Sequence, residues 1–148
     1  MAKKIPYGLT DYFRIVTEDF YYVDKTKYIE DLEKTAAFLF LIRPRRFGKS
    51  LFLNMLNCYY DVKYADRFEE LFGNQYIGKH PTAEQGKYLV LRFNFSMVRA
   101  TDDKLEAAFN RHISLETAYF ASVYASYFKP DFQEQLKLIP EAAGRLEY

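Results

Sequence analysis

The expected fold follows from one stretch of sequence, Phe38-Leu39-Phe40-Leu41-Ile42-Arg43-Pro44-Arg45-Arg46-Phe47-Gly48-Lys49-Ser50-Leu51. A continuous apolar run leads into a basic loop, and the loop ends in Gly-Lys-Ser, where a helix can begin. A strand, a loop and a helix in this order form the context that a phosphate-binding P-loop requires. The stretch therefore predicts a site for the phosphate groups of a nucleotide.

Each residue of the Gly-Lys-Ser triplet supplies one part of such a site. Gly48 lets the backbone approach a phosphate closely, and Lys49 can reach β- and γ-phosphate oxygens. Ser50 can place its hydroxyl on Mg²⁺. The N–H groups that open the following helix face the same anion, and the helix dipole favours negative charge there. Arg45 and Arg46 contact triphosphate oxygens as well, or they are solvated, or they bind the acidic surface of a partner.

The match to the P-loop pattern is incomplete. The pattern has a Gly five residues before the Gly of Gly-Lys-Ser, and Arg43 occupies that place. Gly-Lys-Ser also occurs by chance, so a solvated basic turn is the alternative interpretation. The apolar run before the triplet and the amphipathic helical pattern after it favour the phosphate site.

Composition limits the class of protein. A chain of 148 residues is one ordinary domain or part of a larger one. Its apolar content of 49% and charged content of 28% are typical of a globular protein. The 21 Lys and Arg residues nearly balance the 20 Asp and Glu residues, so no overall basic field favours nucleic acid. The local basic excess lies in Arg43, Arg45, Arg46 and Lys49.

The single cysteine, Cys58, excludes a disulfide within the chain and predicts a reducing, cytoplasmic location. The longest apolar run, residues 36–42, is far too short to cross a bilayer, so no membrane association is expected. The basic residues at the start of the chain lack the apolar stretch of a signal peptide. His80 and His112 have no Cys or His at ligand spacing, so a metal centre built on them is not expected.

Apolar periodicity and turn residues predict the order of the secondary-structure elements. Strands are expected at residues 38–42 and 88–95, and a polar loop is expected at residues 77–87. Thr10 or Asp11 is available to cap the first helix, and Asp24 is expected to cap the second. Helices are expected at residues 9–16, 25–34, 49–60, 67–72, 104–128, 131–138 and 141–148. This order is typical of the opening part of an α/β domain with a P-loop.

Four stretches carry a family resemblance: Pro6-Tyr7-Gly8, Tyr22-Val23-Asp24-Lys25-Thr26, the Arg43 to Leu51 segment and Tyr88-Leu89-Val90-Leu91. They resemble the signature stretches of the bacterial predicted AAA-ATPase-like family, whose own P-loop form has Arg in place of the first Gly. The resemblance covers nearly the whole chain in register. It implies an α/β fold, an incomplete AAA-like three-layer P-loop NTPase domain in residues 1–148. Residues 1–35 would be an N-terminal helical extension, and residues 36–148 the P-loop core.

The resemblance also implies a nucleotide site that binds ATP with Mg²⁺. Ser50 would be the protein ligand of the Mg²⁺ ion. Family members are typically longer and often carry a nuclease-like PD-(D/E)XK domain behind the ATPase domain. The cofactor-binding residues implied are Arg43, Pro44, Arg45, Arg46, Phe47, Gly48, Lys49, Ser50 and Leu51.

The family pattern places its Walker B strand, apolar residues followed by Asp-Glu, soon after the segment that matches residues 140–148. The chain ends first, which suggests a truncated domain that lacks Walker B. The strand expected at residues 88–95 leads into Asn94 and Ser96 without a carboxylate. Because Walker B carboxylates hold Mg²⁺ and orient water, we expect no catalytic residue in this chain. The expected function is ATP binding without hydrolysis.

Two classes of function remain open at this point. The first is the ATP-binding module of an AAA-ATPase-like protein, favoured by the P-loop context. The second is a non-catalytic interaction domain that binds phosphate or nucleic acid, favoured by the lack of Walker B. Asp24, Lys25 and Thr26 either lie beside the adenine, as the matching region does in related ATPases, or only start a helix. The absence of an Asn-Lys-x-Asp stretch favours ATP over GTP, and the oligomeric state does not follow from the sequence.

Overall fold

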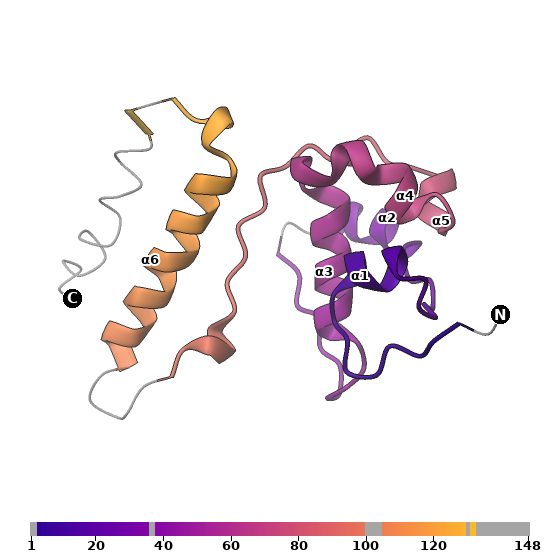
Figure 1. Ribbon diagram of the computed structural model, residues 1–148, viewed down its shortest axis with the longest axis horizontal. Helices are drawn as coiled ribbons and strands as arrows, with labels where there is room; N and C mark the ends of the chain where they lie inside the picture. Colours follow the sequence, from indigo (N-terminus) through magenta and orange to yellow (C-terminus); the bar gives the residue numbers. More distant parts are fainter. Residues whose placement is uncertain (1–2, 36–37, 100–104, 130, 133–148) are drawn as a thin grey trace. The chain divides into compact units, whose positions relative to one another are not determined.

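The computed structural model describes residues 3–35, 38–99, 105–129 and 131–132. Within these ranges the chain forms α- and 3₁₀-helices joined by turns and irregular segments (Figure 1). It divides into two compact units, Met1–Leu89 and Val90–Tyr148. Among the described residues, no helix is both long enough and apolar enough to cross a bilayer. The sequence prediction that residues 1–148 make one domain stays a prediction.

The predicted α/β three-layer P-loop fold is wrong, because the described residues are helical and form essentially no sheet. Their β-pairing consists of isolated bridges between Lys4 and Phe20 and between Asp61 and Tyr88. The expected strand at residues 38–42 belongs to no ladder, and its Phe40 side chain is 91% exposed. A helix closes its hydrogen bonds within its own segment, whereas a strand needs a second strand beside it. Among the described residues, neither predicted strand has a second strand paired beside it.

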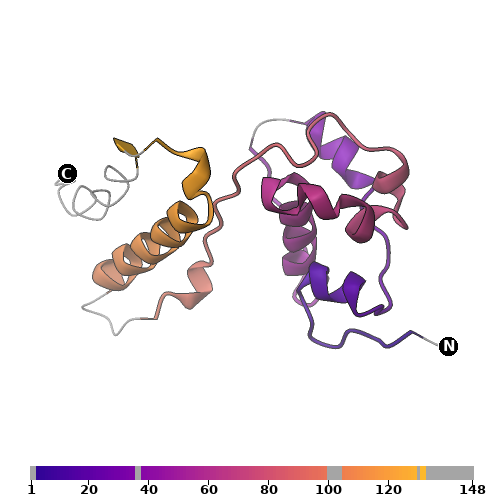
Figure 2. The same cartoon turned by 45° about the horizontal axis from the view of Figure 1, so that its top comes forward.

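The first unit is built around one central helix, α3 (Figure 1 and Figure 2). Helix α1 packs against α3 and α4, and the 3₁₀ helix η1 packs against the same two helices. The views agree that η1 and α4 lie at the C-terminal end of α3, while the loop before Lys49 lies at its N-terminal end. The elements of this unit are α1 (Tyr12–Thr17), α2 (Tyr28–Glu33), α3 (Lys49–Tyr60), η1 (Val62–Arg67), α4 (Phe68–Phe72) and α5 (Tyr76–Lys79).

The local helix predictions for this unit are largely confirmed. Helix α3 spans the predicted residues 49–60. Asp11 caps α1, because its side chain accepts a hydrogen bond of 3.2 Å from the Arg14 N–H. Helix α2 begins three residues later than expected, and the predicted cap Asp24 is wrong because Lys27 holds the N-cap position. Helix α5 occupies the start of the segment that the sequence predicted to be a loop.

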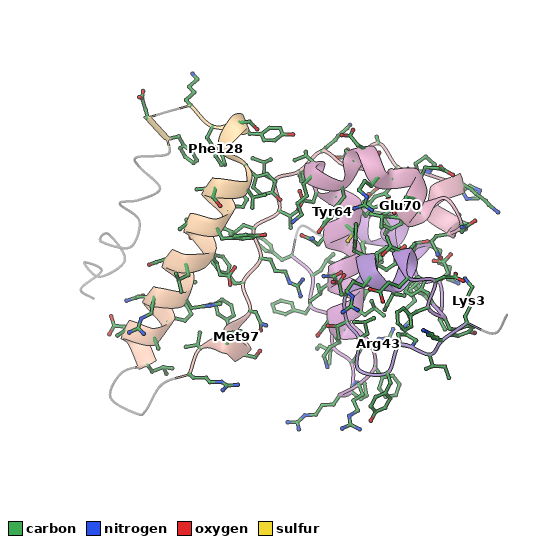
Figure 3. The ribbon with its side chains drawn as sticks, viewed as in Figure 1. Lys3, Arg43, Tyr64, Glu70, Met97 and Phe128 are labelled. Atoms are coloured by element: carbon green, nitrogen blue, oxygen red, sulfur yellow. The ribbon has the colours of Figure 1, made fainter. Side chains whose placement is uncertain are left out.

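The core of the first unit is rich in aromatic side chains, and its buried residues come from α1, α2, α3, α4 and α5. Figure 3 draws the side chains of this unit around these helices. Tyr12, Tyr59 and Phe72 are fully buried, and the Tyr12 ring stacks on Phe72 with 5.2 Å between centroids. The Tyr12 hydroxyl donates a hydrogen bond of 2.9 Å to the Leu71 carbonyl oxygen. Each fully buried side chain of this size contributes about 1.5–3 kcal/mol. This packing fixes the direction of α3 and therefore the place where the loop before it begins.

The second unit contains η2 (Phe95–Met97), α6 (Leu105–Val123) and η4 (Ala125–Tyr127). Phe95 stacks on Phe109 of α6 with ring centroids 5.5 Å apart. Together α6 and η4 cover most of the helix predicted at residues 104–128. The predicted strand 88–95 ends instead in a local turn, where the Asn94 side chain accepts hydrogen bonds from the Ser96 N–H and hydroxyl. The helices predicted beyond residue 132 lie outside the described residues.

Candidate phosphate-binding site

The basic loop reverses direction immediately before α3. Arg46 and Gly48 adopt left-handed backbone conformations, with φ of 65° and 76°. A left-handed residue other than glycine costs about 1–2 kcal/mol, so the surroundings of Arg46 must hold it in place. The Gly48 carbonyl oxygen accepts the first helical hydrogen bond of α3, from the Phe52 N–H at 2.9 Å. The loop therefore lies outside α3, and the helix begins at Lys49 as the sequence predicts.

The Lys49 side chain holds the two ends of this loop together through hydrogen bonds to its backbone. Its ammonium group donates hydrogen bonds to the carbonyl oxygens of Arg43, at 2.6 Å, and of Pro44, at 3.2 Å. An ammonium group has three N–H donors, so two of the three are used within the loop. A phosphate group would have to replace at least one of these carbonyl oxygens to gain two bonds from Lys49. Lys49, the predicted phosphate-binding lysine, is thus hydrogen-bonded to the backbone of its own loop.

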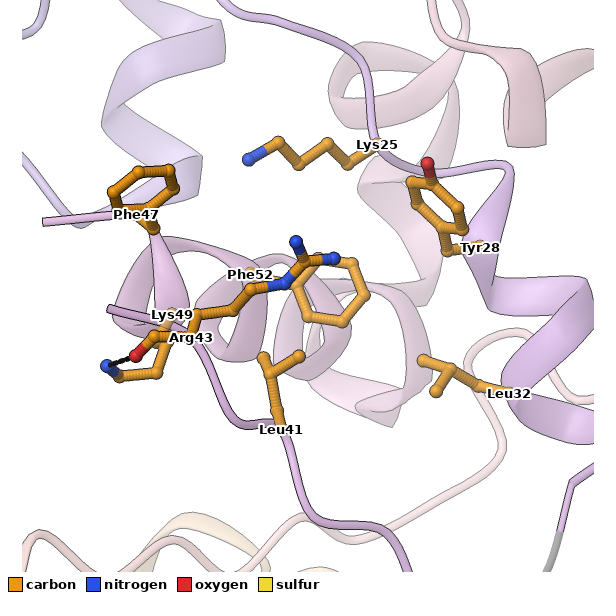
Figure 4. A pocket seen from close by; sticks show the side chains of 9 residues that line it. Lys25, Tyr28, Leu32, Leu41, Arg43, Phe47, Lys49 and Phe52 are labelled. Carbon is orange, nitrogen blue, oxygen red and sulfur yellow. Dashed lines mark hydrogen bonds between the residues drawn. The ribbon is translucent and has the colours of Figure 1, made fainter. Parts of the chain in front are cut away.

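A cavity of about 350 Å³ lies beside the loop, and we call it the Lys49 cavity (Figure 4). Its apolar wall is formed mainly by Tyr28 and Leu32 of α2 and by Phe52 of α3. The basic part of its lining consists of Lys25, Arg43 and Lys49. Figure 4 shows the Arg43 guanidinium extending into the space near Phe52, whereas the Lys49 ammonium turns toward the Arg43 carbonyl.

A second cavity, also of about 350 Å³, shares Lys25, Phe47, Gly48 and Phe52 with the first. We call it the Arg46 cavity, because Arg46 lines it and does not line the Lys49 cavity. The rest of its lining is apolar or aromatic: Ile5, Pro6, Tyr21, Tyr22, Val23 and Leu51.

The other predicted site residues divide between the solvent and the core. Pro44, Arg45 and Ser50 are exposed and line neither cavity. Leu51 packs partly buried against the core cluster. Phe47 lines both cavities, although its side chain is 63% exposed. The structure therefore brings Arg43, Phe47, Gly48 and Lys49 together at the Lys49 cavity.

The sequence left open whether Lys25 lies beside the adenine or only at the start of a helix, and the structure places it beside the loop. Its neighbours Asp24 and Thr26 form a turn in which the Asp24 Oδ1 atom accepts hydrogen bonds from the Thr26 N–H, at 2.8 Å, and from its hydroxyl, at 2.7 Å. An Asp whose side chain bonds to the backbone two residues later is a recognisable turn pattern. That pattern could have indicated a turn at this point. It could not have indicated what the turn lies against.

No acidic group of the described residues complements these cations. Neither cavity is lined by Asp or Glu, and the described residues contain no cluster of three His, Cys, Asp or Glu side chains that could hold a metal ion. The fully buried carboxylate of Asp61 is paired with Lys63 at 3.2 Å. Burial raises the pKa of the Cys58 thiol to about 12, so this cysteine is not a nucleophile at neutral pH. The site offers cations and backbone N–H groups to an anion.

Comparison with known proteins agrees with the loop's sequence. A family model described as predicted AAA-ATPase matches residues 6–145. The chain belongs to this family. A protein of Azotobacter chroococcum mcd 1, described as an uncharacterized protein in the vnfD 5′ region, is 49% identical over 55 residues. Those residues make up 36% of this chain and 11% of that relative. No solved structure matches the chain.

Proposed function

We propose that residues 43–51 of this family member bind the phosphate groups of ATP together with Mg²⁺. The observation that carries the proposal is that Lys25, Arg43 and Lys49 line one cavity whose described lining contains no acidic residue. Like charges gathered around a cavity repel one another, and an anion placed between them removes that repulsion. Membership of the predicted AAA-ATPase family gives a general link to ATP.

In this proposal the phosphate oxygens accept hydrogen bonds from the N–H groups at the start of α3. Gly48 lacks a side chain that would hinder that approach, and the helix dipole favours the anion. The Lys49 ammonium exchanges a carbonyl oxygen of Arg43 or Pro44 for a phosphate oxygen, and that bond is the stronger one because both of its partners are charged. Ser50, which is exposed on the first turn of α3, contributes its hydroxyl to Mg²⁺.

We further propose that these 148 residues bind ATP without hydrolysing it. Hydrolysis requires carboxylates that hold Mg²⁺ and position water in line with the γ-phosphate. The described lining of both cavities contains neither Asp nor Glu. Asp24, the carboxylate next in sequence to Lys25, already accepts hydrogen bonds on both of its oxygens.

Titration calorimetry with Mg-ATP tests the site. Replacing Lys49 by Ala removes a charge-assisted contact and is expected to weaken binding by more than about tenfold. Lys27→Ala removes the same charge from a lysine that lines neither cavity, and it is expected to bind like the unchanged protein. Equal affinities for Lys49→Ala and Lys27→Ala would contradict the proposal and favour the alternative, that the loop is a solvated basic turn.

The second candidate, binding of single-stranded nucleic acid, is favoured by one observation. Arg45, Arg46 and Phe47 are consecutive and exposed, and among the described residues neither arginine forms an ion pair. Cations that follow a phosphate backbone and an aromatic ring that stacks on a base are the usual means of binding single strands. Fluorescence anisotropy with a labelled oligonucleotide separates the candidates. Binding that Arg45→Ala weakens and that excess ATP does not displace would favour nucleic acid.

A further inference from the structure

Lys25 borders both cavities and lies closer to Gly48 than its place in the sequence suggests. A Cβ atom built on Gly48 would lie 3.6 Å from the Lys25 ammonium nitrogen. Figure 4 shows the extended Lys25 side chain directed toward Phe47, across the space that Arg43 also enters. Phe47 and Gly48 line both cavities together with Lys25. The ammonium group is therefore within reach of an anion held at Gly48.

The backbone of Lys25 is held on both sides by hydrogen bonds to a distant helix. The Asp24 Oδ2 atom accepts a hydrogen bond of 2.7 Å from the Tyr76 N–H, and the Thr26 hydroxyl oxygen accepts one of 3.1 Å from the Ile77 N–H. Thr26 is fully buried. These bonds tie residues 24–26 to the start of α5, and Lys25, between the two anchors, is free to extend toward the loop. These two bonds fix the backbone from which the Lys25 side chain extends.

The charge around Lys25 indicates the chemistry of its ligand. Among the described residues it forms no ion pair with Asp or Glu. The charged residues that share its cavities are Arg43, Arg46 and Lys49, all basic. Three other basic residues line the cavities that this half-buried ammonium borders, and such a setting favours an anion with enough charge to pair with several of them. A polyphosphate chain meets this requirement, because it presents charged oxygens over several ångströms.

We infer that Lys25 is a phosphate-binding residue that acts together with the Gly48-Lys49 loop on one polyphosphate chain. This inference rests on the proposed function, because it takes the loop to be the phosphate site. It assigns to Lys25 a direct contact with phosphate oxygens, in addition to those of Lys49. Asp24 and Thr26 are then positioning residues, since they hold Lys25 in place without touching the ligand.

Calorimetric titration with inorganic tripolyphosphate and, separately, with Mg-ATP tests this inference. Lys25→Ala is expected to weaken the binding of both ligands by about tenfold, because the lost contact is charge-assisted and involves phosphate rather than base. Lys25→Arg keeps the charge and is expected to retain most of the affinity. The matched control is Lys27→Ala, since the Lys27 ammonium lies over the Tyr28 ring, 5.2 Å from its centroid, and lines neither cavity. Thermal unfolding of each variant checks that the fold is kept.

Salt dependence separates a direct contact from a structural role. The affinity difference between the unchanged protein and Lys25→Ala is expected to shrink as the salt concentration rises, because salt screens a direct ionic contact. If Lys49→Ala binds weakly while Lys25→Ala matches Lys27→Ala, the Lys25 inference is overturned and the loop site stands. If neither Lys49→Ala nor Lys25→Ala differs from Lys27→Ala, or if the unchanged protein binds neither ligand, both proposals are overturned.

Discussion

The Lys49 ammonium group donates a hydrogen bond of 2.6 Å to the carbonyl oxygen of Arg43, six residues earlier in the chain. Arg43 stands where the P-loop pattern has its first glycine, so this bond joins the two ends of the pattern. The side chain of Arg43 leaves the loop and extends into the Lys49 cavity (Figure 4). The residue that departs from the pattern thus supplies a backbone acceptor to Lys49 and a cation to the cavity.

Gly48 provides a test of the loop with a matched control. Gly48 and Gly8 both have left-handed backbones, with φ of 76° and 70°. Replacing either by Ala is expected to lower the free energy of unfolding by about 1–2 kcal/mol, because the added Cβ strains that conformation. At Gly8 the new atom meets nothing within 4 Å, whereas at Gly48 it lies 3.6 Å from the Lys25 ammonium. Only Gly48→Ala is expected to weaken phosphate binding, as titration calorimetry would measure.

Hydrolysis of ATP by the purified 148-residue protein is expected to be absent. A phosphate-release assay with Mg-ATP should give the same rate for the unchanged protein and for Lys49→Ala, since the described cavity linings offer no carboxylate to position water. Turnover that disappears in Lys49→Ala would contradict this prediction. It would show that a carboxylate outside the described linings serves the site.

Tyr12→Phe is expected to destabilise the first unit by about 1 kcal/mol, because it removes the hydrogen bond to the buried Leu71 carbonyl oxygen and leaves that oxygen unpaired. Tyr7→Phe is the control, because the Tyr7 side chain is 93% exposed. Urea unfolding followed by circular dichroism measures both variants. Equal stabilities would mean that the Tyr12 hydroxyl contributes nothing beyond the packing of its ring.

Stability is expected to fall at alkaline pH. Burial raises the pKa of Cys58 from 9.0 to about 12, so above pH 9 the unfolded chain releases a proton that the folded chain keeps. The free energy of unfolding therefore falls as the pH rises from about 9 toward 12, by as much as about 1.4 kcal/mol per pH unit from this group. Cys58→Val should show a shallower decline between pH 8 and pH 10 in urea unfolding. Identical slopes would mean that the thiol titrates alike in both states.

The tyrosines add to this alkaline effect at higher pH. Burial raises the pKa of Tyr12, Tyr22 and Tyr60 above its ordinary value of 10.0. Their contributions to stability are lost as the pH rises above that value, because the unfolded chain ionises first. The comparison of Cys58→Val with the unchanged protein is therefore cleanest below pH 10, where the thiol difference is least mixed with the tyrosines.

The sequence by itself determined the elements whose physical causes are local. Asp11 could be recognised as a cap because it bonds to a backbone group three residues away. The start of α3 after Gly48 follows from the loop sequence and from hydrogen bonds that span four residues. The basic character of the loop could be predicted equally well, because it comes from side chains that are neighbours in the sequence.

Only the tertiary structure decided whether the apolar run at residues 38–42 forms a strand and what Lys25 faces. An apolar run predicts burial, but burial in a sheet depends on a second strand that local sequence does not specify, and Phe38 and Ile42 are 88% and 87% exposed. Lys25 reaches the Gly48 region because Asp24 and Thr26 bond to backbone groups about 50 residues later in the chain. Contacts over that separation depend on how α3 and α4 pack, so local sequence patterns could not reveal them.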